Sequence, residues 1–123
     1  MRAFSTVAVL AAAFALVQPA AAADPEAGAK IFKTQCGACH AVAAGRNLVG
    51  PSLFGIVGRK SGTIDGFRYS AANKAANLTW DAATLETYLT NPKALVPGTT
   101  MTFVGIKSAE QRADVIAYLA TVK

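Results

Sequence analysis

The sequence predicts an all-α domain of three main helices, short helical turns and long loops. Three segments place apolar residues at helical spacing behind a residue that can cap the N-terminus of a helix. No segment shows the alternation of apolar and polar residues that is typical of a half-buried strand. The chain has 123 residues, which fits one domain.

The first helix is expected to begin after Asp24 and to run to about Gln35. Asp24 can cap this helix, Pro25 suits its first turn, and the charge of Glu26 favours the positive end of the helix dipole. Gly28 is a poor helix former, so its position inside the helix indicates a close packing contact.

Residues 41–70 are interrupted by glycine or proline every few positions, which indicates a long loop. Loops of this length in a small domain are usually either functional or disordered. One short helical turn is expected between Tyr69 and Ala76.

Two further helices are expected in the second half of the chain. Asp81 caps the first of them, and Asn91 followed by Pro92 ends it. The last helix begins at Ser108, which forms a capping-box pattern with Gln111. Their apolar faces are formed by Leu85, Tyr88 and Leu89 in one helix and by Val115, Ile116, Leu119 and Ala120 in the other.

Residues 1–23 are typical of a secretory signal peptide. Arg2 supplies a positive charge, residues 7–17 form an uncharged apolar run, and residues 21–23 offer an A-x-A cleavage site. The apolar run is shorter than the roughly 20 residues that a membrane span needs. An uncleaved N-terminal anchor is the alternative. Cleavage leaves one domain at residues 24–123 and predicts a periplasmic protein whose mature form has no membrane span.

The mature chain keeps a basic charge. Without Arg2 it has 11 basic against 7 acidic residues, a net charge of +4. This charge suits acidic protein partners or nucleic acid. The basic residues are scattered and form no Lys/Arg-rich run, so we expect no nucleic-acid binding. Nothing in the sequence predicts an oligomer, and we expect a monomer.

The two cysteines, Cys36 and Cys39, are followed directly by the only histidine, His40. A disulfide is one interpretation, and a redox-active C-x-x-C site is another, although the latter is expected near a βαβ pattern. A zinc site would need four ligands, and the chain has no third cysteine and no second histidine. C-x-x-C-H is also the signal for covalent attachment of haem c. We favour haem, with each thiol bonded to one vinyl group and the imidazole held beneath the iron.

The second axial ligand depends on what the mature chain contains. Met101 is its only methionine, because Met1 is removed with the signal peptide. Either Met101 binds the iron, or the sixth position is open or held by a weaker group. A lone methionine is often core filler, but Met101 lies in a turn-rich stretch, residues 97–103, that can cross a cofactor face. Histidine with methionine is the ligand pair of electron-transfer haem proteins.

Several separate motifs follow one another along the mature chain. They are GAKIF at residues 28–32, CGACH at 36–40, GPSL at 50–53, GRK at 58–60, GFRYS at 66–70, NK at 73–74, LTW at 78–80, YLTNPK at 88–93 and PGTTM at 97–101. In this order they resemble class I cytochrome c, the group of soluble mitochondrial cytochrome c and bacterial cytochrome c2. The resemblance implies the cytochrome c fold around one covalent haem c.

The resemblance also implies contacts on the histidine side. The carbonyl of Pro51 would accept a hydrogen bond from Nδ1 of His40, which fixes the tautomer of the ring and raises its donor strength. Gly28 and Phe32 on the first helix would cross Tyr118 on the last helix.

Further roles are implied around the haem. Tyr69 and Trp80 would donate hydrogen bonds to the propionates, and Arg59 would balance their charge. The methionine side would be lined by Asn73, Tyr88 and Thr99. Without the resemblance, Trp80 and Tyr88 would be interpreted as core aromatics and Arg59 as a surface charge.

The chain departs from the mitochondrial pattern in its basic rim. Lysines that are common there are replaced by Gln35, Leu48, Ala94 and Thr100, while Lys30, Lys33, Lys93 and Lys107 remain. Charge steering mainly raises association rates and weakens with salt, so a strongly acidic partner is less expected. Asn47 lies near the position of a second histidine in that group, and one loop hydrogen bond must therefore be made differently.

The function expected from these observations is one-electron transfer by a soluble carrier, not enzyme catalysis. The resemblance suggests a cytochrome bc1 complex or a dehydrogenase as donor, and a terminal oxidase or photosynthetic reaction centre as acceptor. Two alternatives stay open. One is a haem protein with an open distal site, such as a peroxidase or a gas-binding protein, and the other is a thiol protein without haem.

Overall fold

The computed structural model describes residues 22–123, so most of the expected signal peptide lies outside the described residues. Within this range the helices are α1 (Pro25–Gln35), α2 (Ala71–Ala75), α3 (Ala82–Thr90), α4 (Pro92–Leu95) and α5 (Ala109–Thr121). Between residues 22 and 123 the β pairing is limited to an isolated bridge between Lys60 and Thr79. The all-α class, with three main helices and shorter helical turns, is confirmed. No helix among these residues is long and apolar enough to cross a membrane.

Each main helix begins at the capping residue expected from the sequence. The bonds run from Glu26 N to Asp24 Oδ1 at 2.9 Å, from Thr84 N to Asp81 Oδ1 at 2.8 Å and from Gln111 N to Ser108 Oγ at 3.2 Å. These bonds satisfy backbone N–H groups that have no partner inside the helix. The backbone and side-chain hydrogen bonds from Thr84 lower the pKa of Asp81, because they stabilise the ionised carboxylate.

Helix α4 is a helix that the sequence did not predict. Asn91 and Pro92 end α3 as expected, but the same two residues also begin α4. The Asn91 side chain accepts a hydrogen bond from Ala94 N at 3.3 Å, and Pro92 occupies the first turn, where its missing N–H costs nothing. One Asn-Pro pair therefore serves as the end of one helix and the cap of the next.

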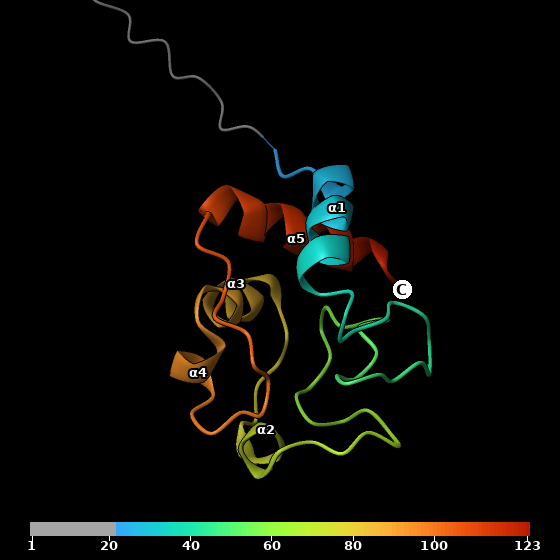
Figure 1. The fold of residues 1–123 in the computed structure, drawn as a ribbon, viewed down its shortest axis with the longest axis vertical. Coiled ribbons are helices and arrows are strands. Elements are labelled where there is room, and N and C mark those ends of the chain that lie inside the picture. Colours follow the sequence, from blue (N-terminus) through green and yellow to red (C-terminus); the bar gives the residue numbers. More distant parts are fainter. Residues whose placement is uncertain (1–21) are drawn as a thin grey trace, which may run out of the picture.

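Helices α1 and α5 form the main helix pair, and α3 packs against both α4 and α5 (Figure 1). The crossing of α1 and α5 depends on Gly28, as expected. A Cβ atom there would overlap the backbone carbonyl oxygen of Asp114 and lie 2.9 Å from Cβ of Tyr118. Phe32, one turn further along α1, packs on Tyr118 with ring centroids 5.6 Å apart.

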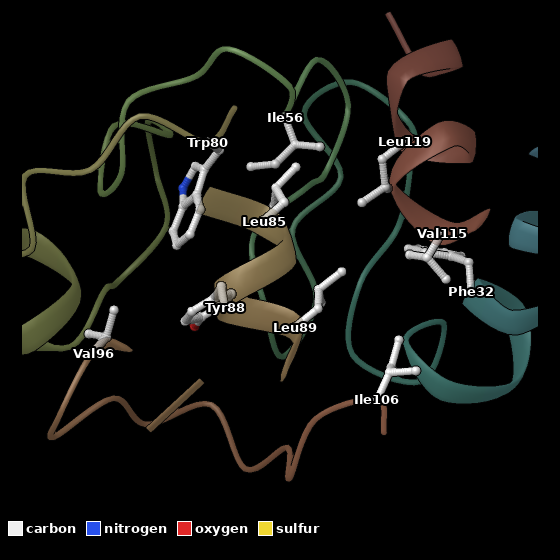
Figure 2. Close-up of a cluster of buried hydrophobic side chains, with 10 residues drawn as sticks. All are labelled: Phe32, Ile56, Trp80, Leu85, Tyr88, Leu89, Val96, Ile106, Val115 and Leu119. Carbon is white, nitrogen blue, oxygen red and sulfur yellow. The ribbon is translucent and has the colours of Figure 1, made fainter. Parts of the chain in front are cut away.

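The long loop of residues 41–70 forms the side of the domain opposite α3 and α4 (Figure 1). Buried apolar side chains from α1, α3, α5 and the loops gather between these two sides, as Figure 2 shows. They are Phe32, Ile56, Trp80, Leu85, Tyr88, Leu89, Val96, Ile106, Val115 and Leu119. This cluster is the hydrophobic core, and most of it faces the cavity described next.

Candidate haem site

One cavity occupies the centre of the domain, and all site residues predicted from the sequence line it. They are Cys36, Cys39, His40, Pro51, Arg59, Tyr69, Asn73, Trp80, Tyr88, Thr99 and Met101. The remaining wall is largely apolar and includes Leu85 and Leu89 of α3 and Val115 and Leu119 of α5. The sequence identified these four as helix faces, but only the packing of α3 beside α5 turns them toward a shared cavity.

The two cysteines follow α1 in a tight turn. Cys36 is the residue after the last turn of α1, and its carbonyl accepts hydrogen bonds from the N–H groups of Cys39 and His40 at 3.1 and 2.9 Å. Both thiols are free. Burial, with a smaller effect from Cys39, raises the pKa of Cys36 to about 11. Redox-active C-x-x-C cysteines have lowered pKa values, so this environment argues against the thiol-redox alternative.

His40 is held by the loop that follows it. Its Nδ1 lies 2.8 Å from the carbonyl oxygen of Pro51, and because a carbonyl only accepts, Nδ1 carries the proton and Nε2 has the free lone pair. Burial lowers the pKa of His40, partly offset by the Pro51 bond, so the neutral ring is favoured. Gly50 packs directly on the ring, and a Cβ atom there would lie 2.6 Å from Nδ1. The histidine is therefore oriented and in the protonation state that binds metals.

Met101 lies in the segment between α4 and α5. Tyr88 on α3 donates a hydrogen bond from its hydroxyl to Sδ of Met101 at 3.3 Å. The N–H of Met101 donates to Oγ1 of Thr99 at 3.2 Å, and the Thr99 hydroxyl donates to Oδ1 of Asn73 at 2.8 Å. Ser70, the cap of α2, donates to the same oxygen at 2.7 Å. Both the sulfur and the backbone of Met101 are thus tied to distant parts of the chain.

Arg59, Tyr69 and Trp80 also line the cavity. Arg59 donates to the carbonyl oxygen of Ser52 at 2.9 Å and to that of Phe54, which ties residues 52–59 into one loop. Burial lowers the pKa of Arg59, and nearby Tyr69 partly offsets this effect. The Trp80 ring packs on Tyr88 with centroids 4.7 Å apart.

Asn47 provides a loop contact that the sequence left undefined. Its Oδ1 accepts a hydrogen bond from the N–H of Ser52 at 2.9 Å, and the Ser52 hydroxyl donates to the carbonyl of Ala43 at 2.6 Å. Ser52 is almost fully buried, and although it is part of the GPSL motif, the sequence did not predict these bonds. These bonds fix the loop that presents the Pro51 carbonyl to His40.

The residues present fit an iron porphyrin. The wall is mainly apolar, an oriented imidazole and a thioether both line it, and two free thiols stand next to the imidazole. Among residues 22–123 no group of three or more His, Cys, Asp or Glu side chains is placed to hold a metal ion by itself. The all-α fold and this donor set define the class: a c-type haem protein.

Comparison with known proteins names the family. The cytochrome c family model matches residues 25–123, so the chain belongs to the cytochrome c family of haem-binding electron carriers. It is 55% identical to cytochrome c2 of Rhodoplanes tepidamans over 98 residues, which cover 79% of this chain and 91% of that protein. It is 48% identical to cytochrome c of Euglena viridis over 100 residues, 81% of this chain and 98% of that protein.

A solved structure agrees with this membership. Cytochrome cH from Methylobacterium extorquens superposes with a TM-score of 0.75 at 47% identity, covering 80% of this chain and 98% of that one. The class I cytochrome c fold expected from the sequence is confirmed. The cofactor is one covalent haem c, as in the family.

Replacing Gly50 by alanine is expected to displace the His40 ring, because the new methyl group would stand closer to Nδ1 than packing allows. Overpacking of this kind typically costs about 1–3 kcal/mol. Denaturant unfolding and the NMR resonance of the His40 Nδ1 proton measure the two effects. Gly45→Ala is the matched control, because Gly45 has a positive φ but nothing within 4 Å of an added Cβ. It should lower stability through backbone strain and leave the histidine resonance in place, and equal resonance changes in both variants would contradict the argument.

Proposed function

We propose that this protein is a one-electron carrier whose haem is attached through Cys36 and Cys39 and ligated axially by His40 and Met101. The observation that carries the proposal is the state of the two ligand side chains. Nδ1 of His40 and one lone pair of the Met101 sulfur are already engaged by Pro51 and Tyr88. Each ligand therefore keeps one free lone pair, and both line the same cavity.

Bound haem supplies an iron that changes between the ferric and ferrous states. The residues of the chain hold that iron in one environment for both states. Pro51 keeps the imidazole in one tautomer and orientation, and Tyr88 limits rotation of the thioether. The apolar wall excludes water, which together with methionine ligation favours a high reduction potential.

We assign the remaining wall residues by the family resemblance. Tyr69 and Trp80 would donate to the propionates, with Arg59 as the balancing cation. Asn73 and Thr99 would act on the methionine side, where they already form one hydrogen-bonded chain with Met101.

A site closed by two protein ligands offers no position for a substrate, so we propose that the protein is not an enzyme. A peroxidase or gas-binding function would need the sixth position to be open. Binding of carbon monoxide to the reduced protein at neutral pH would favour that alternative, and a pyridine haemochrome spectrum checks the covalent haem.

Met101→His is expected to lower the reduction potential by on the order of 0.1 V or more, because axial ligands set haem potentials over a range of about 0.8 V. The covalent attachment should be intact, since neither cysteine is changed. Redox titration and the haemochrome spectrum measure the two properties. An unchanged potential would mean that Met101 does not bind the iron.

We also propose that residues 1–23 are removed during export and that the mature protein, residues 24–123, is periplasmic and monomeric. The position of the fold's first residue supports this boundary. Asp24 caps α1, and its backbone nitrogen donates to the buried carboxylate of Asp114 at 2.8 Å.

The exported protein is expected to have the mass of residues 24–123 plus one haem, measured by intact mass spectrometry. Ala23→Phe should block processing, because the cleavage site needs small residues at its first and third positions. Ala22→Phe changes the middle position and should be processed normally. A wild-type mass that corresponds to a different first residue would refute this boundary, and normal processing of Ala23→Phe would show that Ala23 does not precede the cleaved bond.

Redox proteins are the proposed partners: a cytochrome bc1 complex or a dehydrogenase as donor, and a terminal oxidase or photosynthetic reaction centre as acceptor. No lysine is among the described residues that line the cavity, and Gln35 and Thr100, which do line it, stand at two positions of the basic rim where the mitochondrial pattern has lysines. Docking at this rim would therefore depend only modestly on charge.

The rate of electron transfer to a purified cytochrome c oxidase is expected to fall by less than about tenfold when salt is raised from about 0.01 M to 0.15 M. Stopped-flow kinetics measures this rate. Lys33→Gln, near the cysteine turn, should lower the low-salt rate more than Lys74→Gln on α2. A decrease of about a hundredfold or more with salt would indicate strong charge steering instead.

A further inference from the structure

The segment that carries Met101 has little structure of its own. Residues 97–108 connect α4 to α5 without a helical turn. Its internal backbone bonds are short-range, from Thr99 N to the carbonyl of Val96 at 3.1 Å and from Phe103 N to that of Met101 at 3.0 Å. Such bonds shape the segment locally but do not fix it against the rest of the domain.

The segment is fixed five residues beyond Met101, at Ile106. The Ile106 side chain is 2% exposed, although it does not line the haem cavity. Its N–H donates to the carbonyl of Leu89, in α3, at 2.7 Å. Gly105 allows this approach, because a Cβ atom there would overlap the carbonyl oxygen of Thr90 and lie 3.0 Å from that of Leu89.

Arg112 in α5 also binds the segment at Ile106 and Lys107. Its Nη1 donates to the carbonyl oxygens of Ile106 at 2.7 Å and Lys107 at 3.1 Å, and its Nε donates to Glu86 Oε1 at 2.6 Å. The Arg112 side chain is only 11% exposed, whereas that of Glu86 is 42% exposed, so solvent screens the ion pair from the Glu86 side. One guanidinium thus joins α5, α3 and the end of the Met101 segment.

We propose that Arg112, oriented by Glu86, is a positioning residue that holds Met101 on the haem iron. Arg112 acts on Met101 by restraining the backbone at Ile106 and Lys107, and not by contact with the methionine side chain. For the methionine to leave the iron, residues 97–108 must move, and the pinned carbonyls of Ile106 and Lys107 confine that motion to the few residues before them. Without the Arg112 bonds, the Ile106 N–H bond to Leu89 alone holds the segment at this point, so the part that moves extends further toward α5.

The chemistry of the contact requires arginine. A guanidinium presents several N–H donors in a rigid plane, so it can serve a carboxylate and two carbonyls at once, whereas a lysine ammonium is a flexible point charge. Glu86 accepts from Nε and thereby sets the plane in which Nη1 reaches the carbonyls. Charge-assisted bonds of this kind are stronger than neutral ones.

The test uses the ferric holoprotein and imidazole as an external ligand, because imidazole binds only when the methionine has left. Arg112→Lys keeps the charge and loses the planar donors, so the imidazole binding rate should rise about tenfold, as for the loss of one hydrogen bond from a charged group. Glu86→Gln keeps a neutral acceptor and should raise the rate about threefold. Amide exchange at Phe103 and Ile106 should become faster in Arg112→Lys than elsewhere in the domain.

Ile31→Val is the control, because it reduces the packing of α1 on the hydrophobic core without changing a cavity-lining residue or a hydrogen bond of residues 97–108. It should lower overall stability and leave the imidazole rate unchanged. Equal acceleration by Ile31→Val, or a wild-type rate in Arg112→Lys, would show that Arg112 only stabilises the fold and would overturn the inference.

The inference rests on the proposed ligation by Met101, and the two can fail separately. If the unmodified ferric protein lacks the weak red charge-transfer band of a methionine-ligated haem, the proposed ligand is wrong whatever Arg112 does. If that band is present and the Arg112→Lys rate is unchanged, the ligand assignment stands and the positioning role fails.

Discussion

The structure depends on a core whose side chains are also the wall of a cofactor site. Of the buried apolar residues, all but Val96 and Ile106 line the central cavity. Protein interiors are close-packed. The interior of this domain becomes close-packed only when the porphyrin fills the cavity. Binding of the cofactor therefore contributes directly to the stability of the folded state. The haem is a structural component as much as a redox centre.

The two proposed ligands are held in different ways. His40 belongs to the same short turn as both cysteines, and the loop bearing Gly50 and Pro51 orients its ring. Met101 is not held by a turn and a neighbouring loop in this way. Its sulfur is bonded to Tyr88, and its segment is pinned beyond Gly105. A carrier that changes oxidation state benefits from ligands oriented in advance, because little rearrangement then accompanies each transfer.

This difference indicates where the site is most easily opened. With the haem attached at Cys36 and Cys39 as proposed, the histidine side would be secured by covalent bonds next to the ligand, whereas the methionine side relies on hydrogen bonds between elements far apart in sequence. Segments with few buried contacts of their own open at lower free energy than packed helices. The contacts of Arg112 and Glu86 place an ion pair where such opening would begin. The apolar cavity and the Met101 segment, which is held at Ile106 and Lys107, would together restrain the position of the iron and its ligands.

The sequence by itself determined the features whose interactions span a few residues: the helix starts at Asp24, Asp81 and Ser108, the end of α3, and the C-x-x-C-H turn. The motif order also pointed, through resemblance, to residues that all line the central cavity. Only the tertiary structure decided that Gly50 packs on the imidazole and that Arg112 reaches Glu86 and Ile106. The physical reason is the distance along the sequence over which each interaction acts. A cap or a covalent motif is complete within one turn of chain, whereas contacts between α3, α5 and the Met101 segment exist only once the helices have packed.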